Sequence, residues 1–131
     1  MNIEFKLYKP QYYDAIKANL IDSGQFDELW DSKDNINGMD HIVMAMLDNS
    51  VIGSVCIMKY GGVTAQLFRL NVRKEFRSKG IGTRLLIQAK YMAKLLGYKE
   101  IALLCKSDSQ EYYEKRGFVR FGEYTWMEKK V

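Results

Sequence analysis

The stretch from Leu70 to Leu86, LNVRKEFRSKGIGTRLL, constrains the fold of this chain more than any other. A β-prone segment ends at Val72, a short basic loop follows, and from Gly80 onward apolar residues recur at the spacing of an α-helix. The sequence therefore predicts a strand, a loop and a helix N-terminus in direct succession. The first turn of a helix has backbone N–H groups without intrahelical partners and carries the positive end of the helix dipole. Such a terminus favours a phosphate or pyrophosphate ligand.

The side chains of this loop point to the same kind of ligand. Gly80 and Gly82 lack Cβ, so a ligand can approach the backbone closely and the chain can take a positive φ. The loop is rich in cations, opposed only by Glu75: Arg73, Lys74, Arg77, Lys79 and Arg84. We expect an anionic ligand. The P-loop pattern does not fit, and the dinucleotide fingerprint would need a third glycine where Leu85 stands.

Composition narrows the class of protein. With 131 residues, 47% of them apolar, and one proline, the chain is long enough for a single folded domain over residues 1–131 and is not disordered. No apolar run approaches the roughly 20 residues of a membrane span, and the first ten residues lack a signal-peptide core, so we expect a cytoplasmic protein. Cys56 and Cys105 lie in strand-like segments without metal-ligand spacing, which favours buried reduced thiols and no metal.

Hydrophobic periodicity gives the expected order of elements. Helical spacing or capping residues predict helices in four places, the second capped by Ser23 and holding Phe26, Leu29 and Trp30, and we expect a loop over 31–40. The expected helices are 10–21, 23–30, 80–96 and 108–116. Alternating or continuous apolar runs predict the strands 3–7, 41–47, 51–60, 63–72, 101–105, 118–121 and 123–129.

These elements predict an α/β sandwich in the order β-α-α-β-β-β-α-β-α-β-β. Short turns make the strands from 41 to 72 an antiparallel meander. The long helix then implies a right-handed crossover, which places strand 101–105 parallel to the strand that ends at Val72. The expected result is a mixed sheet with helices on both faces.

Two motifs stand in this frame. The first is R-x-x-G-x-G from Arg77 to Gly82, preceded by L-x-V over residues 70–72. The second is Tyr113-Glu114-Lys115-Arg116-Gly117-Phe118, which matches the pattern Y-E-K-x-G-F. Together with the element order, they make essentially the whole chain resemble the GNAT superfamily of N-acetyltransferases.

The resemblance implies acetyl-CoA as co-substrate and assigns residues to it. The strand residues Leu70, Asn71 and Val72 would pair with the pantetheine arm. The loop and helix N-terminus would hold the pyrophosphate through backbone N–H groups of Arg77, Ser78, Lys79, Gly80, Ile81, Gly82 and Thr83. Tyr113 stands where the family has its general acid, which protonates the departing thiolate. Lys106 replaces an asparagine that often contacts the cofactor, so Lys106 either contacts a phosphate or faces solvent.

The family generally transfers the acetyl group directly to an amine within a ternary complex, which agrees with cysteines that are part of the core. The acceptor is then a small cationic amine or a protein amine. The general base is not identified, because the positions where the family places an acid carry Gln66, Arg69 and Ile101. The remaining candidates for the general base are a water chain and an acidic residue of the segment 22–34. That acidic segment either attracts a cationic acceptor or is a solvated face.

Other residues and functions stay open at this stage. We expect Tyr112 to pack and His41 to be structural or exposed, while Trp30 and Trp126 either line the acceptor pocket or belong to the core. A catalytically silent coenzyme A sensor is the alternative function. A nucleic-acid-binding module is weaker, because only Phe76 interleaves the basic loop. We expect neither a nucleic acid nor a membrane partner, and exposed edge strands leave a homodimer open.

Overall fold

The computed structural model describes residues 2–39, 41–105, 109–121 and 126–130. In this part of the chain, a seven-stranded sheet has the order β1-β2-β3-β4-β5-β7-β6. Its strands are β1 (Glu4–Leu7), β2 (His41–Leu47), β3 (Ser50–Gly61), β4 (Thr64–Val72), β5 (Glu100–Leu104), β6 (Val119–Phe121) and β7 (Trp126–Lys130). The helices are η1 (Pro10–Tyr12), α1 (Tyr13–Asp22), α2 (Lys33–Asn37), η2 (Lys74–Phe76), α3 (Ile81–Leu95) and α4 (Gln110–Glu114).

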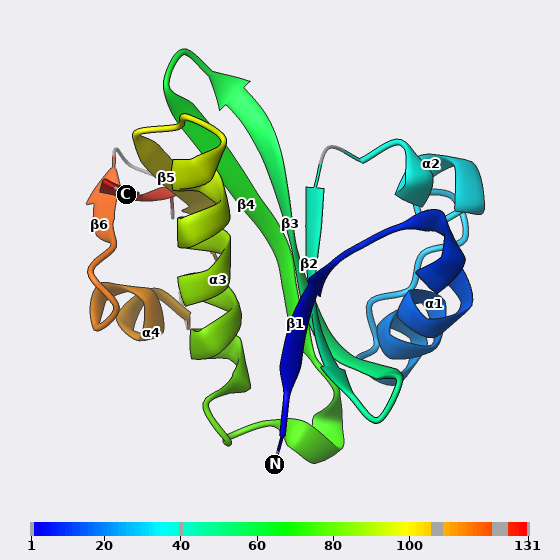
Figure 1. The fold of residues 1–131 in the computed structure, drawn as a ribbon. Coiled ribbons are helices and arrows are strands. Elements are labelled where there is room, and N and C mark those ends of the chain that lie inside the picture. The colour runs from blue at the N-terminus through cyan, green and yellow to red at the C-terminus, as the bar shows by residue number, and fades with distance from the viewer. Residues whose placement is uncertain (1, 40, 106–108, 122–125, 131) are drawn as a thin grey trace.

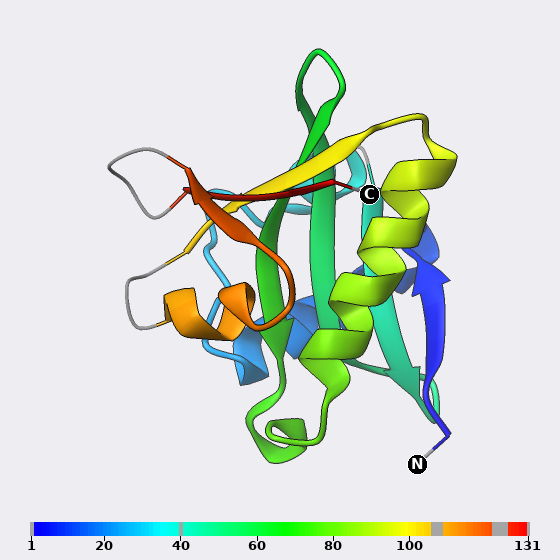
Figure 2. The same cartoon turned by 90° about the vertical axis from the view of Figure 1, so that its left-hand side faces the viewer.

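Helices cover both faces of the sheet, as Figures 1 and 2 show. On one face α3 buries Leu85, Ala89 and Ala93 against alternate residues of β2 to β5, and the tyrosines of α4 pack against the same cluster. On the other face α1 buries Ile16 and Leu20 against the intervening side chains of β2 and β3. The period-two alternation of the strands therefore feeds two separate hydrophobic cores. The expected α/β sandwich is confirmed.

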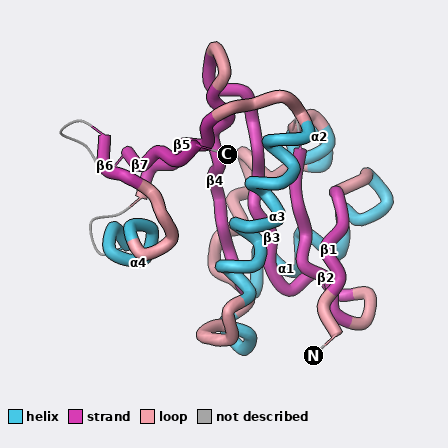
Figure 3. Tube along the Cα trace, turned by 60° about the vertical axis from the view of Figure 1, so that its left-hand side comes forward, coloured by secondary structure: helices cyan, strands magenta, loops and turns pink. Residues whose placement is uncertain are grey.

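The parallel pairing of β4 with β5 is also as expected, but it is short. It joins Thr64 to Glu100, Ala65 to Ile101 and Gln66 to Ala102. Beyond Gln66 the strands diverge, and β4 runs on to Val72 without β5 beside it (Figure 2). From there the sheet bends away: α4, β6 and β7 lie at the opposite end from β1, with α3 between them (Figure 3). A sheet edge without a neighbouring strand thus opens in the middle of the fold, and side chains of Gln25 and Arg77 donate to the carbonyl oxygens of Leu70 and Val72 there.

The second predicted helix is wrong in position. Residues 23–32 form turns, and the short helix is α2, inside the segment expected to be a loop. Its N-cap is Ser32, whose Oγ accepts a hydrogen bond from the backbone N–H of Asn35. The Oδ1 atom of Asp27 accepts hydrogen bonds from the N–H groups of Leu29 and Trp30. Acidic side chains that bond nearby N–H groups in this way stabilise turns in place of a helix.

The cysteines and tryptophans agree with the sequence-based expectations only in part. Cys56 is buried, Cys105 is half-buried, and no disulfide joins them. Trp30 does not belong to the core, because 69% of its surface is exposed. The side chain of Trp126 and the start of the fourth predicted helix at Asp108 lie outside the described residues. No helix in the described ranges has the length and apolar character needed to span a membrane.

Candidate active site

Three adjoining cavities form a groove where β4 and β5 diverge. The innermost, of about 420 Å³, lies between these strands and is bounded by Leu67, Leu104 and Tyr113. The middle one, of about 390 Å³, shares Leu70 and Tyr113 with it. The outermost, of about 360 Å³, lies over the loop before α3 and shares Gly82 with the middle cavity. The groove therefore runs from the N-terminus of α3 to the gap in the sheet.

The outer end of the groove is built from backbone. Gly80 is the N-cap of α3 with a φ of 79°, and no side chain caps the helix. Because the first turn of a helix has no intrahelical acceptors for its N–H groups, the donors of Ile81, Gly82 and Thr83 are available to a ligand. A Cβ on Gly82 would lie 3.1 Å from the hydroxyl of Tyr112. Glycine at this position therefore keeps the helix N-terminus accessible beneath the tyrosine.

The basic side chains around this loop are arranged differently from the sequence-based expectation. Three of the five arginines and lysines have partners other than a ligand. Arg73 forms an ion pair with Asp22 at 2.7 Å. Arg77 donates through Nε to the carbonyl oxygen of Val72 at 2.9 Å, and the Arg84 guanidinium lies 5.0 Å from the ring centre of Phe5. These cations hold the loop in place, and the anion-binding potential rests mainly on the backbone.

The strand beside the gap carries a β-bulge. The partner of Ser54 is Asn71, whereas the partner of Cys56 is Phe68, so Val55 stands opposite two residues of β4. Arg69, one of these two, has a φ of 56°. A bulge leaves one residue out of the ladder and redirects the side chains around it. Here it places the Arg69 side chain on the face that carries the segment 23–32.

The Arg69 side chain holds this segment against the sheet. Its guanidinium forms a two-pronged ion pair with Asp31 and donates to the carbonyl oxygen of Gln25 at 2.8 Å. The Asp31 carboxyl is fully buried. Burial raises its pKa, but hydrogen bonds from Arg69 and from the N–H of Asp27 outweigh burial and hold the pKa below its ordinary value of 3.8. Asp31 is therefore a charged structural group and is not positioned to take protons.

Tyr113 of α4 lines both the inner and the middle cavity. Its ring meets those of Tyr112 and Phe118 edge to face, with centroids 5.2 and 5.7 Å apart. Burial raises the pKa of Tyr113 to about 12, the negative fields of Tyr112 and Cys105 add to the rise, and Arg116 opposes it. The hydroxyl thus stays protonated across the physiological range and is available as a hydrogen-bond or proton donor.

The sequence did not reveal a contact between α4 and the start of α3. Arg116 lies over the Tyr112 ring, 3.4 Å from its centre, and donates through Nε to Thr83 Oγ1 at 2.8 Å. The Tyr112 hydroxyl also lies 3.3 Å from Thr83 Oγ1. Tyr112 packs against the hydrophobic core, as expected, but it also lines the outer cavity. In the helix expected over 108–116, Tyr112 and Arg116 are four residues apart and share one face, which is the signal that indicates this role, although α4 ends at Glu114.

Comparison with known proteins shows the family of this chain. The model of the acetyltransferase (GNAT) family matches residues 5–118. The chain belongs to this family. It is thus a GNAT-type acetyltransferase, an enzyme of the acyltransferase class. No curated protein sequence matches it significantly.

Solved GNAT structures share the fold over the whole chain. The PaiA N-acetyltransferase of Thermoplasma acidophilum, in complex with coenzyme A, has 24% identity and a TM-score of 0.81, with 100% of each chain covered. A GNAT-family acetyltransferase of Staphylococcus aureus Mu50 has 14% identity and a TM-score of 0.84, covering 98% of this chain and 99% of that one. YhbS of Escherichia coli, also in complex with coenzyme A, has 16% identity and a TM-score of 0.79, covering 99% and 82%.

The expected GNAT cofactor residues are brought together in part. Eight of them line the middle or outer cavity, five from β4 and the first turn of α3 and three from the loop between them: Leu70, Asn71, Val72, Gly82, Thr83, Arg77, Ser78 and Gly80. Ile81 also borders the outer cavity, but its side chain is buried in the core, so only its backbone faces the groove. Lys79 is exposed and lines none of these three cavities. Lys106 lies outside the described residues.

Asn71 has an additional structural role. Its side chain is buried, accepts a hydrogen bond from Asn19 at 2.6 Å and donates to Ser54 Oγ at 2.8 Å. These bonds join α1, β3 and β4 beside the groove. A buried amide that uses its side chain in this way leaves only its backbone for a ligand.

Proposed function

We propose that this GNAT enzyme transfers the acetyl group of acetyl-CoA directly to an amine acceptor in a ternary complex. The observation that carries the proposal is the continuous groove from the α3 N-terminus to the gap between β4 and β5. One end offers backbone donors to a pyrophosphate, and the other offers a strand edge and the partly buried hydroxyl of Tyr113 to a thioester. The coenzyme A complexes of similar GNAT folds support the choice of cofactor.

The cofactor would be held mainly by backbone groups. Arg77 to Thr83 supply the N–H groups for the pyrophosphate, with Lys79 contributing long-range attraction. Leu70, Asn71 and Val72 lie on β4 beyond its last pair with β5 at Gln66. Their backbone can therefore pair with the amide groups of the pantetheine arm as an added strand does.

Tyr113 is our candidate for the general acid. When the amine attacks the thioester carbon, a bond to nitrogen forms, the carbon–sulfur bond breaks, and the sulfur leaves as a thiolate that needs a proton. The partly buried hydroxyl, with a pKa of about 12, is protonated at neutral pH and borders the inner cavity. A strand N–H beside the thioester would stabilise the oxyanion of the intermediate without reorganisation.

The residues that line the groove bear on which group accepts the proton of the attacking amine. Among the described residues that line the three cavities, none is an aspartate, a glutamate or a histidine. The acid-rich segment does not supply the base through Asp31, whose carboxylate is engaged by Arg69. An amine with a pKa of about 10 is mostly protonated at neutral pH. Loss of its proton to water is therefore the route we propose, with a small amine or a protein amine as acceptor.

The test combines binding with turnover. Calorimetry with acetyl-CoA should give saturable heat, and incubation with acetyl-CoA, a panel of small amines and peptides, and a thiol reagent should release free thiol with at least one acceptor. A mass increase of one acetyl group on that acceptor confirms transfer. Saturable binding without thiol release for any acceptor favours the silent sensor. If acetyl-CoA gives no heat and an oligonucleotide binds with steep salt dependence, the enzyme proposal is wrong.

A further inference from the structure

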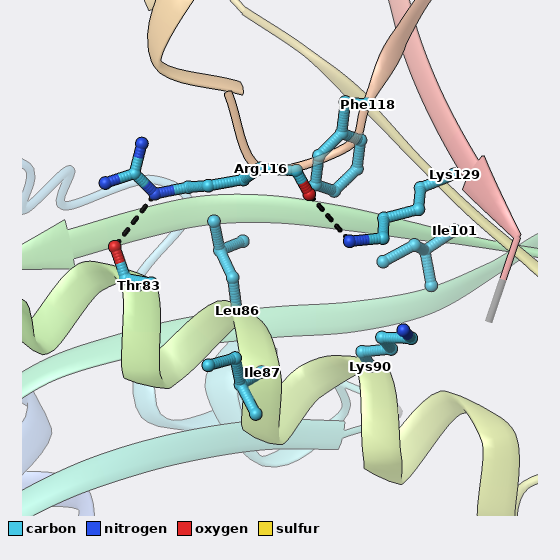
Figure 4. Close-up of a pocket in the computed structure, with 8 residues that line it drawn as sticks. All are labelled: Thr83, Leu86, Ile87, Lys90, Ile101, Arg116, Phe118 and Lys129. Atoms are coloured by element: carbon cyan, nitrogen blue, oxygen red, sulfur yellow. Dashed lines mark hydrogen bonds between the residues drawn. The ribbon is translucent and has the colours of Figure 1, made fainter. Parts of the chain in front are cut away.

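A separate cavity of about 240 Å³ lies on the other side of the contact between α3 and the chain after α4 (Figure 4). It is lined by Thr83, Leu86, Ile87, Lys90, Ile101, Arg116, Phe118 and Lys129. These residues come from α3, β5, β7 and the turn between α4 and β6. Thr83 and Arg116 also border the outer cavity of the cofactor groove, so their hydrogen bond forms a wall between the two spaces.

The floor and one side of this pocket are apolar. Leu86, Ile101 and Phe118 are buried beneath it and belong to the main core. Ile87 rises from α3 at the rim with 47% of its surface exposed. Figure 4 shows Leu86 and Ile87 extending from α3, with Phe118 and Ile101 across from them. A hydrophobic group of a ligand would therefore remove apolar surface from water on both partners.

The polar groups of the pocket are all hydroxyl or cationic. Lys90 and Lys129 face it from α3 and β7, and Arg116 forms its end. Lys129 donates through Nζ to the backbone carbonyl oxygen of Arg116 at 2.6 Å. None of the described lining residues carries a carboxylate. Burial lowers the pKa of Lys129, and the positive charge of Lys90 lowers it further. Two ammonium groups thus share one concave space in which no described lining residue offers a counter-charge, and an anion would supply one.

We infer that this pocket binds a small organic anion with an apolar body, such as an aromatic carboxylate. The carboxylate would lie between Lys90 and Lys129, and the ring would rest on Ile87, Leu86 and Phe118. The volume is below the range typical of drug-sized ligands, which restricts the occupant to a compact molecule. This site goes beyond the proposed acetyl transfer, because it is separated from the groove by the wall of Thr83 and Arg116.

That wall also connects the two sites. Arg116 contacts the pocket, donates to Thr83 at the α3 N-terminus, and covers the Tyr112 ring over the cofactor loop. An anion that binds the pocket and acetyl-CoA that binds the groove can therefore be present together. If binding of one alters the affinity of the other, the change is the same in both directions.

The probe for this inference is benzoate. Its binding to the folded protein is measured by calorimetry or by changes in NMR chemical shifts. We expect saturable binding that Lys90→Gln weakens about tenfold, because a charge-assisted hydrogen bond is lost. Lys94→Gln is the matched control: Lys94 is exposed one turn further along α3 and does not line the pocket, so benzoate affinity should stay the same. Ile87→Trp should abolish saturation by filling the opening, and circular dichroism verifies that each variant is folded.

Three results would overturn the inference. They are the absence of saturable benzoate binding, equal benzoate affinity in wild type and Lys90→Gln, and strict competition between benzoate and coenzyme A. The last result would show that the pocket is an extension of the cofactor groove. None of these readouts requires acetyl transfer, so the failure of this site and the failure of the proposed function are distinguishable.

Discussion

The two sides of the groove are built by different means. The first side, residues 70–86, where we propose that the cofactor binds, uses a strand edge, glycines and a helix N-terminus, all of which are local features of the chain. The second side, residues 23–37, which reaches the groove through Gln25, is turns and one short helix held to the sheet by the ion pair of Asp31 and Arg69. Local backbone geometry is encoded within a few residues. A clamp between residues far apart in sequence exists only in the folded state, so the two sides should respond differently to substitution.

The largest expected effect is on the second side, in residues 23–37. Asp31→Ala leaves the Arg69 guanidinium without its buried partner and should lower the free energy of unfolding by about 3 kcal/mol. Urea denaturation measures this change. Asp34→Ala, which removes an exposed carboxylate in the first turn of α2, should cost less than about 1 kcal/mol. The double variant Asp31→Leu with Arg69→Met should recover much of the loss. Equal losses of stability in Asp31→Ala and Asp34→Ala would contradict a structural role of the ion pair.

The same ion pair predicts a pH dependence. The pKa of Asp31 is lowered in the folded protein, so its stabilising contribution is complete above the ordinary value of 3.8 and is lost as the pH falls through the folded pKa. The decline in stability of the wild type between neutral and acidic pH should therefore be steeper than that of Asp31→Asn. Denaturation curves at a series of pH values test this, and parallel declines would show that other carboxylates dominate.

The next effect concerns catalysis. Tyr113→Phe should lower kcat by about a hundredfold, the usual scale of lost general-acid assistance, while acetyl-CoA affinity stays unchanged. Tyr91→Phe is the control, because Tyr91 is exposed on α3 and should leave kcat as it is. Steady-state thiol release and calorimetry separate the two parameters. A loss of cofactor affinity with unchanged kcat would make Tyr113 a packing residue.

A matched pair of glycines compares the two sides directly. Gly80 and Gly24 have φ values of 79° and 78°, and at neither would a new Cβ meet another atom within 4 Å. Alanine at either position should cost about 1–2 kcal/mol through backbone strain alone. Only Gly80→Ala should also weaken acetyl-CoA binding, because only Gly80 borders the groove. Equal losses of affinity in both variants would remove the distinction.

The smallest effect is expected where the two sides meet. Asp22 at the end of α1 pairs with Arg73 of the loop, but its side chain is 54% exposed. Asp22→Asn should therefore cost less than about 1 kcal/mol, and the difference from wild type should shrink in high salt. Thermal unfolding at two salt concentrations measures it. A larger, salt-independent loss would indicate that this pair positions the loop.

The comparison also explains which predictions failed. Leu70, Gly80 and Tyr113 lie in short patterns whose geometry follows from neighbouring residues, and all three line the groove, while their roles stay predictions. The second helix was misplaced because Ser23 resembles a helix cap in the sequence, whereas Asp27 and Asp31 stabilise turns after it in the structure. The basic loop was read as a ring of ligand-facing cations, yet Arg73, Arg77 and Arg84 are engaged elsewhere. The partners of these side chains lie in segments far away in the sequence, and the spacing of apolar residues does not indicate such contacts.

The sequence by itself determined the order of the elements, the two faces of the sheet and the helix N-terminus after the glycine loop, because apolar spacing and backbone freedom act over a few residues. Tertiary structure alone decided that β5 leaves β4 after Gln66, that Arg69 reaches Asp31, and that Lys90 meets Lys129 in one pocket. Those features join residues far apart in the chain. Their energies arise from burial and charge in the assembled fold, where no local pattern can encode them.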